Sequence, residues 1–297
     1  MSHGVRPGRG PAIHLGAGPL LAWSAAALVA LALRPEAARA QWVEQPGKGW
    51  VDLTVYHIDT RQTFGSSGRR RSFFSDGHAV STSVFLTIAA GLAPGLDGWV
   101  QVPYQRLRFD DAGGDRLRSG VGDTRLYLRV APLHFFGSDF PLAIRGGVKI
   151  PVGDFNVDSQ VIPLGDGQTD WELMGELGHS FYPVPAYVSG WVGYRWREEN
   201  DLTLQDFGDE RFFLVQGGWT YEGVGLQLTV EGWDGNPPII EGLRLPNAKR
   251  QMLQVTPSAS FAAGPGQIRV GARSALAGRN LPAGTSLVVG YFTNWSF

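Results

Sequence analysis

The chain has 297 residues, a formal net charge of −1, 41 glycines and no cysteine. Charged residues make up 18% of it, below the roughly 25% that is usual for soluble domains. The missing thiols exclude a cysteine nucleophile, a zinc–cysteine site and a disulfide framework. The near-neutral charge argues against nucleic acid as a partner, because a protein that binds phosphates needs a basic face.

Residues 1–40 have the layout of a secretory signal peptide. Arg6 and Arg9 form a basic start, and a continuous apolar run follows over residues 19–33. Ala38 and Ala40 supply the small residues of a cleavage site. The apolar run would rise only about 22 Å as a helix, which is short of a ~30 Å hydrocarbon core. We therefore expect cleavage after Ala40 and export of residues 41–297.

Apolar residues recur at every second position through most of residues 41–297. Between residues 140 and 152, for example, one phase of the alternation is apolar, and the other phase carries Arg145 and Lys149. Successive side chains of a strand point to opposite faces, so each such segment has one apolar and one polar face. The period of two indicates β-strands rather than helices.

About twelve segments show this alternation, and no linker divides them, so we predict one domain over residues 41–297. Short turns alternate with long loops rich in Gly, Asp, Arg and Asn, which is typical of an antiparallel up-and-down meander. The third segment is the least regular, because its alternation changes phase around Pro103. The predicted strands span 49–60, 77–91, 98–108, 121–132, 139–152, 168–182, 186–198, 209–222, 224–234, 250–262, 267–278 and 285–297.

Two architectures fit such strands: a soluble sandwich or barrel, and an outer-membrane barrel whose apolar face points outward. Alternation alone does not distinguish them. The signal peptide, the even number and length of the strands, and the alternation of turns and loops favour the membrane barrel. A closed barrel also pairs every backbone group that lipid would leave unpaired. We predict an all-β fold, a transmembrane up-and-down antiparallel β-barrel of about 12 strands, in contact with the lipid of the bacterial outer membrane.

The last predicted strand alternates up to an aromatic residue at position 297. The alternating residues are Leu287, Val289, Tyr291, Thr293, Trp295 and Phe297. This ending resembles the recognition strand of bacterial outer-membrane proteins. We therefore expect the barrel-assembly machinery to bind the strand that ends at Phe297.

Several tryptophans lie toward the ends of the predicted strands. An outer-membrane barrel carries aromatic girdles at both membrane interfaces, so we expect these residues to form an interfacial belt. They are Trp99, Trp171, Trp196, Trp219, Trp233 and Trp295.

If the polar phase of each strand faces the lumen, opposite charges lie on neighbouring strands, where they can pair. One interpretation is a pore whose charges select and orient a polar or amphipathic solute. The other is a lumen that these side chains fill, because barrels of roughly eight strands are filled and those of sixteen to eighteen hold a wide channel. The predicted pore-lining residues are Arg125, Arg129, Arg145, Lys149, Asp170, Glu172, Glu176, Arg195, Arg197, Glu231, Arg269 and Arg273. The predicted inward set also includes Asp52, Gln216 and Gln227.

The sequence offers no strong catalytic or metal-binding motif. The histidines beyond residue 40 lack HExxH or paired spacing; they are His57, His78, His134 and His179. Asp170 and Glu172 share one strand face, and we interpret them as part of an ion-pair row. We predict no enzyme activity, no catalytic residue, no cofactor and no metal. Two alternatives stay open: a barrel enzyme acting on lipid through His57 or His179, and a structural or adhesive barrel with a closed lumen.

Three short motifs follow one another in the middle of the chain. They are G-x-G-D at Gly120–Asp123, G-x-K-x-P-x-G-D at Gly147–Asp154, and L-G-x-G-x-x-D at Leu164–Asp170. In order and spacing they resemble the MetA-pathway phenol-degradation family of bacterial outer-membrane transporters. The resemblance covers most of residues 41–297 and is weaker outside the motifs. It implies passage of a small solute, often a hydrophobic or aromatic compound, and it carries over no catalytic or binding residue.

The same motifs also have a purely structural interpretation. Glycine before Asp123 permits a tight backbone where a strand begins. Pro151 cannot donate to a strand ladder, so it ends the strand before it. We therefore expect all three motifs at the end of the barrel that carries the long loops.

Overall fold

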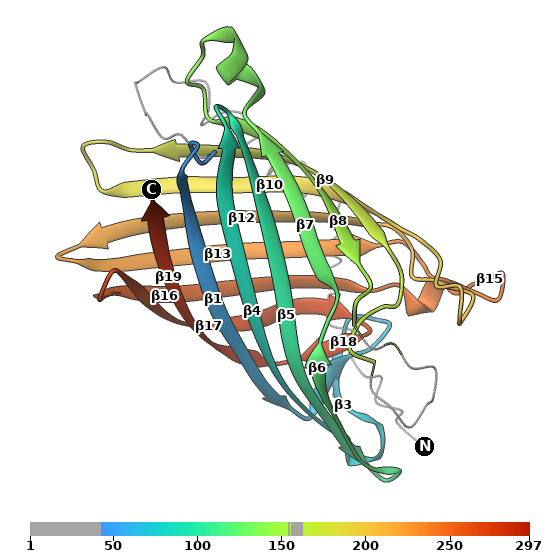
Figure 1. Cartoon of the computed structure of the whole chain (residues 1–297). Coiled ribbons are helices and arrows are strands. Elements are labelled where there is room, and N and C mark those ends of the chain that lie inside the picture. The colour runs from blue at the N-terminus through green and yellow to red at the C-terminus, as the bar shows by residue number, and fades with distance from the viewer. Residues whose placement is uncertain (1–42, 154, 156–162) are drawn as a thin grey trace, which may run out of the picture.

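The computed structural model describes residues 43–153, 155 and 163–297, which form a closed β-barrel (Figure 1). Twelve antiparallel strands make the wall, with β6 and β7 following one another in a single wall position beside β5. The predicted fold is confirmed. The predicted signal peptide lies outside the described residues. The wall strands are β1 (Lys48–Thr60), β4 (His78–Ala93), β5 (Leu96–Asp111), β6 (Gly114–Val121) with β7 (Thr124–Val130), β8 (Leu142–Ile150), β9 (Asp170–Ser180), β10 (Ala186–Arg197), β12 (Glu210–Tyr221), β13 (Val224–Gly235), β16 (Gln251–Ala263), β17 (Gly266–Arg279) and β19 (Thr285–Ser296).

The first and last strands close the barrel. β1 pairs antiparallel with β19, from Lys48 opposite Ser296 to His57 opposite Leu287. On its other side β1 pairs antiparallel with β4, and the remaining wall strands pair with their neighbours in chain order. Closure therefore pairs the backbone groups that an open sheet edge would expose to lipid.

The two ends of the barrel differ. At the short-turn end (upper left in Figure 1), tight turns and one 3-10 helix, η2 (Pro132–Phe136), join the strands. The long-loop end carries two three-stranded sheets, β18-β2-β3 and β11-β14-β15. No helix among the described residues is long and apolar enough to cross a membrane. The elements of the long-loop end are β2 (Gln62–Phe64), β3 (Arg70–Ser72), η1 (Phe74–Asp76), β11 (Gln205–Asp206), β14 (Ile239–Ile240), β15 (Leu243–Arg244), η3 (Pro246–Ala248) and β18 (Leu281–Ala283).

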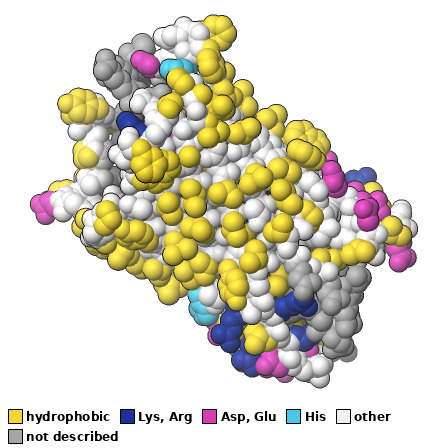
Figure 2. Space-filling model, in the orientation of Figure 1, with side chains coloured by type: hydrophobic (Ala, Val, Ile, Leu, Met, Phe, Trp, Pro, Cys, Tyr) yellow, Lys and Arg dark blue, Asp and Glu magenta, His cyan; other side chains and the backbone are white. Residues whose placement is uncertain are grey.

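The outside of the barrel is apolar, and its inside is polar. Hydrophobic side chains spread over the outer face in Figure 2, whereas Arg129, Arg145 and Lys149 are buried. A soluble protein would place these two classes the other way round, and a lipid-facing barrel has this arrangement. Exposed outward residues from several strands are Leu86, Leu128, Leu173, Leu228 and Val289.

The irregular third segment is a strand that changes its partner. β5 pairs with β7 up to Gln101 and with β6 from Tyr104 onward. Between them, the Gly122 N–H donates to the Pro103 carbonyl at 2.9 Å. The change of phase around Pro103 therefore marks the step from β7 to β6 in the wall.

Two of the tryptophans predicted for an interfacial belt lie elsewhere. Trp99 and Trp233 line the interior cavity, so that part of the prediction is wrong. Trp233 lies two residues from Glu231, which lines the same cavity. Position along a strand suggested the interface, but parity decides which face a side chain occupies. The tryptophans that are about half exposed on the outer face are Trp171, Trp196 and Trp219.

Candidate functional site in the barrel interior

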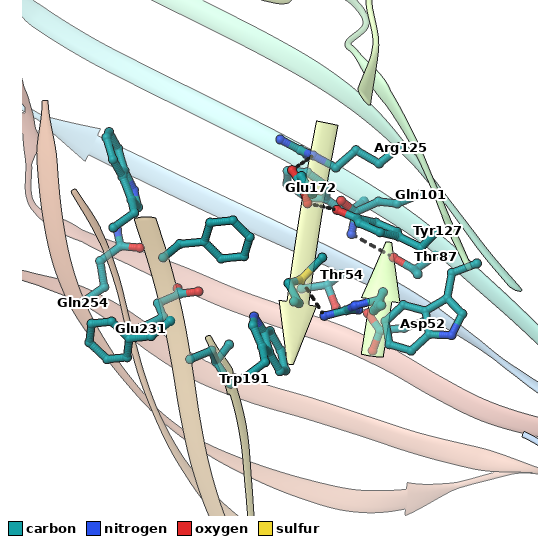
Figure 3. A pocket seen from close by; sticks show the side chains of 18 of the residues that line it. Asp52, Thr54, Thr87, Gln101, Arg125, Tyr127, Glu172, Trp191, Glu231 and Gln254 are labelled. Carbon is teal, nitrogen blue, oxygen red and sulfur yellow. Dashed lines mark hydrogen bonds and ion pairs between the residues drawn. The ribbon is translucent and has the colours of Figure 1, made fainter. Parts of the chain in front are cut away.

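The barrel interior holds a cavity of about 640 Å³ (Figure 3). Arg125 and Glu172 lie on one side of the view, and Glu231 and Gln254 lie on the other. The lining is rich in aromatic rings. The sequence-based assignment did not predict them, because it placed the apolar residues of each strand on the outer face. Parity was the available signal, because Trp50 lies two residues from the predicted inward Asp52. The aromatic lining is Trp50, Tyr56, Phe85, Trp99, Tyr127, Trp191, Phe212, Phe213, Trp233 and Phe292.

Arg145 occupies an aromatic cage at the edge of this cavity. Its guanidinium carbon lies 4.4 Å from the ring centre of Trp99, and 5.1 Å from those of Tyr127 and Trp191. Its Nε atom lies 2.6 Å from Glu176 Oε1. Stacking on rings suits the planar, weakly hydrated guanidinium. Arg145 and its cage therefore fill part of the lumen.

A second buried ion pair lies closer to the short-turn end. Arg129 Nη2 is 2.6 Å from Asp97 Oδ2, and the Asp97 side chain is fully buried. The backbone N–H of Glu44 donates to the same carboxylate at 2.8 Å, and Val43 is buried beside it. The segment before β1 is therefore held inside this end of the barrel. The sequence-based assignment included Arg129 and omitted Asp97.

Glu172 is the centre of a cluster on the wall formed by β7, β9 and β10. Arg195 Nε donates to Glu172 Oε1 at 2.7 Å, and the Tyr127 hydroxyl donates to Oε2 at 2.9 Å. Arg125 Nε lies 3.7 Å from Oε1. Arg195 also donates through Nη1 to Glu210. Arg195 thus pairs with Glu172 and Glu210 as their cross-strand neighbour, whereas Arg125 reaches Glu172 across β8.

The opposite wall carries two separate ion pairs. Arg269 Nη2 donates to Asp52 Oδ2 and to Thr54 Oγ1, each at 3.0 Å. Arg273 Nε lies 3.0 Å from Glu231 Oε1, and its guanidinium carbon lies 4.0 Å from the ring centre of Tyr56. These pairs join β17 to β1 and to β13, which no single stretch of sequence reveals.

The two predicted inward glutamines hydrogen-bond each other. Gln227 Nε2 donates to Gln216 Oε1 at 3.3 Å, and Gln216 Nε2 donates to Ser189 at 3.0 Å. They link β13, β12 and β10 on the inner side of the wall.

Lys149 lies among three carboxylates at the long-loop end of β8. Its Nζ atom is 2.8 Å from Asp166 Oδ2, 2.9 Å from Asp170 Oδ2 and 3.3 Å from Asp123 Oδ2. The lysine side chain is only 1% exposed. A buried charge is tolerated only with such partners, so we interpret this cluster as a structural feature that stabilises the long-loop end of the barrel.

Arg197 adds a second cation to the same cluster. Its Nη2 donates to Asp166 Oδ2 at 2.7 Å and its Nη1 to Glu210 Oε1 at 3.1 Å, and Nε lies 3.5 Å from Asp170 Oδ1. Burial alone would raise the pKa of Asp166, but Arg197 and Lys149 outweigh it and hold that pKa well below its usual range. Asp166 is therefore ionised at neutral pH.

The three motifs of the family resemblance meet beside this cluster, as far as they are described. The backbone N–H of Asp166 donates to Asp123 Oδ2 at 2.9 Å. Leu164 is buried and packs against Gly120, where a Cβ would come within 2.7 Å of its Cδ1. A Cβ on Gly165 would lie 2.1 Å from Asp123 Oδ1. Glycine is therefore required for close approach, and the predicted place at the long-loop end is confirmed.

Every charged residue predicted to line the lumen forms an ion pair within the described barrel. Whether they line a conducting pore stays a prediction. Some acidic partners are absent from the predicted set. They lie near strand ends or in a loop, where the alternation does not assign a side chain to the inner or the outer face. These acidic partners are Asp97, Asp123, Asp166 and Glu210.

The histidines do not gather into one site. His57 Nδ1 lies 2.9 Å from Thr82 Oγ1, and His78 Nε2 lies 2.6 Å from Asp59 Oδ1. The His179 ring packs edge-on against Phe181. Within the described ranges, no group of three His, Cys, Asp or Glu residues is arranged to hold a metal ion.

Comparison with solved structures finds outer-membrane barrels. An outer membrane channel from Pseudomonas putida F1 matches with a TM-score of 0.69 and 18% identity, over 88% of this chain and 100% of that chain. The β domain of the Bordetella autotransporter BrkA matches with a TM-score of 0.53 and 12% identity, over 84% of this chain and 100% of that chain. No family model and no curated protein matches the sequence. At these identities the likeness establishes the outer-membrane β-barrel fold.

Proposed function

We propose that the protein is a channel of the bacterial outer membrane through which small hydrophobic or aromatic solutes diffuse without energy coupling. The observation that carries this proposal is a cavity of about 640 Å³ with an aromatic and charged lining, inside a barrel whose exterior is apolar. The motif resemblance to the MetA-pathway family supports it, as does the similarity in fold to an outer membrane channel.

Planar-bilayer recording and liposome uptake test this proposal directly. Purified barrel should produce discrete single-channel events in potassium chloride, and liposomes that contain it should take up a neutral aromatic probe such as benzyl alcohol faster than empty ones. Absence of both conductance and uptake would overturn the proposal.

A structural barrel with a closed lumen is the second candidate, because Arg145 and Lys149 are almost fully buried in ion pairs. Arg273→Gln separates the two candidates. In a channel, loss of this cation leaves Glu231 facing the cavity and raises the permeability ratio of potassium to chloride by about 2- to 5-fold. The matched control is Arg108→Gln, which removes an exposed arginine paired with Asp115 and should leave the ratio unchanged. A closed barrel predicts no current for either variant.

A further inference from the structure

The two walls of the cavity present their charges differently. On the wall with Glu172, the side chains of Arg125 and Arg195 are 26% and 20% exposed, whereas Glu172 is only 2% exposed. On the opposite wall, Arg273 and Glu231 are exposed to similar degrees. On the first wall, guanidinium groups therefore face the cavity, and the carboxylate of Glu172 lies behind them.

The guanidinium groups of Arg125 and Arg195 also have N–H groups that make no hydrogen bond within the described part of the chain. Among the described residues, Arg125 has one polar partner, Glu172, through Nε. Arg195 uses Nε and Nη1 for Glu172 and Glu210, and its Nη2 has no partner in the described part of the chain. Arg125 and Arg195 approach the same oxygen, Glu172 Oε1. Two neighbouring guanidiniums with free N–H groups match the geometry of a carboxylate acceptor.

Aromatic rings surround these donors. The Arg195 guanidinium carbon lies 5.1 Å from the ring centre of Phe212, and the Tyr127 ring lines the same cavity with Trp191. Arg195 covers a face of Phe212 and Arg145 covers a face of Tyr127, so a planar ring bound here would meet the edges of these rings, in the edge-on arrangement that aromatic groups prefer. The site thus combines hydrogen-bond donors for a carboxylate with neighbouring aromatic rings.

We propose that Arg125, Arg195, Tyr127 and Phe212 form a subsite for aromatic monocarboxylates on their way through the barrel. The carboxylate accepts hydrogen bonds from Arg125 and Arg195, and the ring lies against Tyr127 and Phe212. This inference rests on the proposed channel function and narrows its solute class. A neutral hydrophobic compound would leave the two guanidiniums unused.

The test compares three probes of similar size in proteoliposomes: benzoate, cyclohexanecarboxylate with the same charge but no aromatic ring, and benzyl alcohol with the ring but no charge. Protein-dependent uptake, after subtraction of uptake by empty liposomes, should be at least about 3-fold faster for benzoate than for either of the others. Arg125→Gln should slow benzoate uptake by about 3- to 10-fold relative to benzyl alcohol uptake into the same liposomes, with single-channel events in potassium chloride still present. Glu172 stays paired with Arg195 and Tyr127 in this variant, and Arg108→Gln is the matched control.

Phe212→Leu tests the aromatic half separately and removes no charged side chain. It should bring the uptake ratio of benzoate to cyclohexanecarboxylate close to one. Conductance with equal uptake of all three probes would overturn the subsite, as would benzoate uptake that Arg125→Gln does not slow. Absence of conductance and of uptake for every probe would instead overturn the channel proposal.

Discussion

At the scale of single residues, the interior depends on charges that lie too deep to be solvated. Lys149 is 1% exposed and touches three carboxylates. Taking such charges out of water costs several kcal/mol for each ion, and their mutual contacts offset that cost. Removing one member is therefore more damaging than its number of hydrogen bonds suggests.

We expect Lys149→Met to lower the free energy of unfolding by about 3–5 kcal/mol, because it leaves buried carboxylates without their cation. Chemical denaturation in detergent, followed by tryptophan fluorescence, measures the change. Lys249→Met is the matched control: Lys249 pairs with Asp234 and is 27% exposed, so its loss should cost less than about 1 kcal/mol. Equal effects of the two substitutions would contradict the stabilising role of the buried Lys149 ion pairs.

The depressed pKa of Asp166 predicts that part of the free energy of unfolding is lost in acid. Its pKa is depressed in the folded barrel, so the unfolded chain takes up the proton first as pH falls. The stabilisation is fully present above the ordinary aspartate value of about 4, and it is lost as pH falls from there through the folded pKa. Asp166→Asn should lower the thermal midpoint at pH 7 and differ less from wild type at pH 3. A difference that grows toward pH 3 would have the wrong sign.

At the scale of elements, alternation alone located most of the strands. The twelve predicted segments correspond to the twelve wall positions, and the irregularity at Pro103 marks the step between β7 and β6. β6 itself was missed, because all of Gly114–Val121 except its last residue lies between the predicted segments 98–108 and 121–132. The motifs around Asp123 and Leu164 predicted an end of the barrel but not their mutual contact. That contact joins residues about forty positions apart, and a period of two carries no information on which loops meet.

We expect Gly165→Ala to loosen this contact, since its Cβ would overlap Asp123, and to cost about 1–3 kcal/mol of stability through the lost Asp123–Asp166 hydrogen bond. Limited proteolysis of the long-loop end and denaturant unfolding both report the change. Gly175→Ala is the control, because the space around its Cβ is open. Faster cleavage in the control than in Gly165→Ala would contradict the packing role of Gly165.

At the scale of the whole molecule, stability in a membrane depends on the outer face. Leu228 lies in the middle of β13 and is 51% exposed on that face. We expect Leu228→Lys to destabilise the barrel by about 2–4 kcal/mol, because a charge near the bilayer midplane is costly. Gln254→Lys, which changes a residue lining the cavity, should cost less. Refolding into lipid vesicles followed by denaturant titration compares the two, and an equal cost would contradict the lipid-facing assignment of Leu228.

The sequence by itself determined the barrel, the approximate strand boundaries and the polar character of the interior, because the period of two is a local property of each strand. Only the tertiary structure decided which charges pair, that Trp99 and Trp233 face inward, and that arginines cover Glu172 in the cavity. These features depend on the register of strands brought together by closure. Pairs such as Arg269 with Asp52, which joins β17 to β1, exist because the barrel closes.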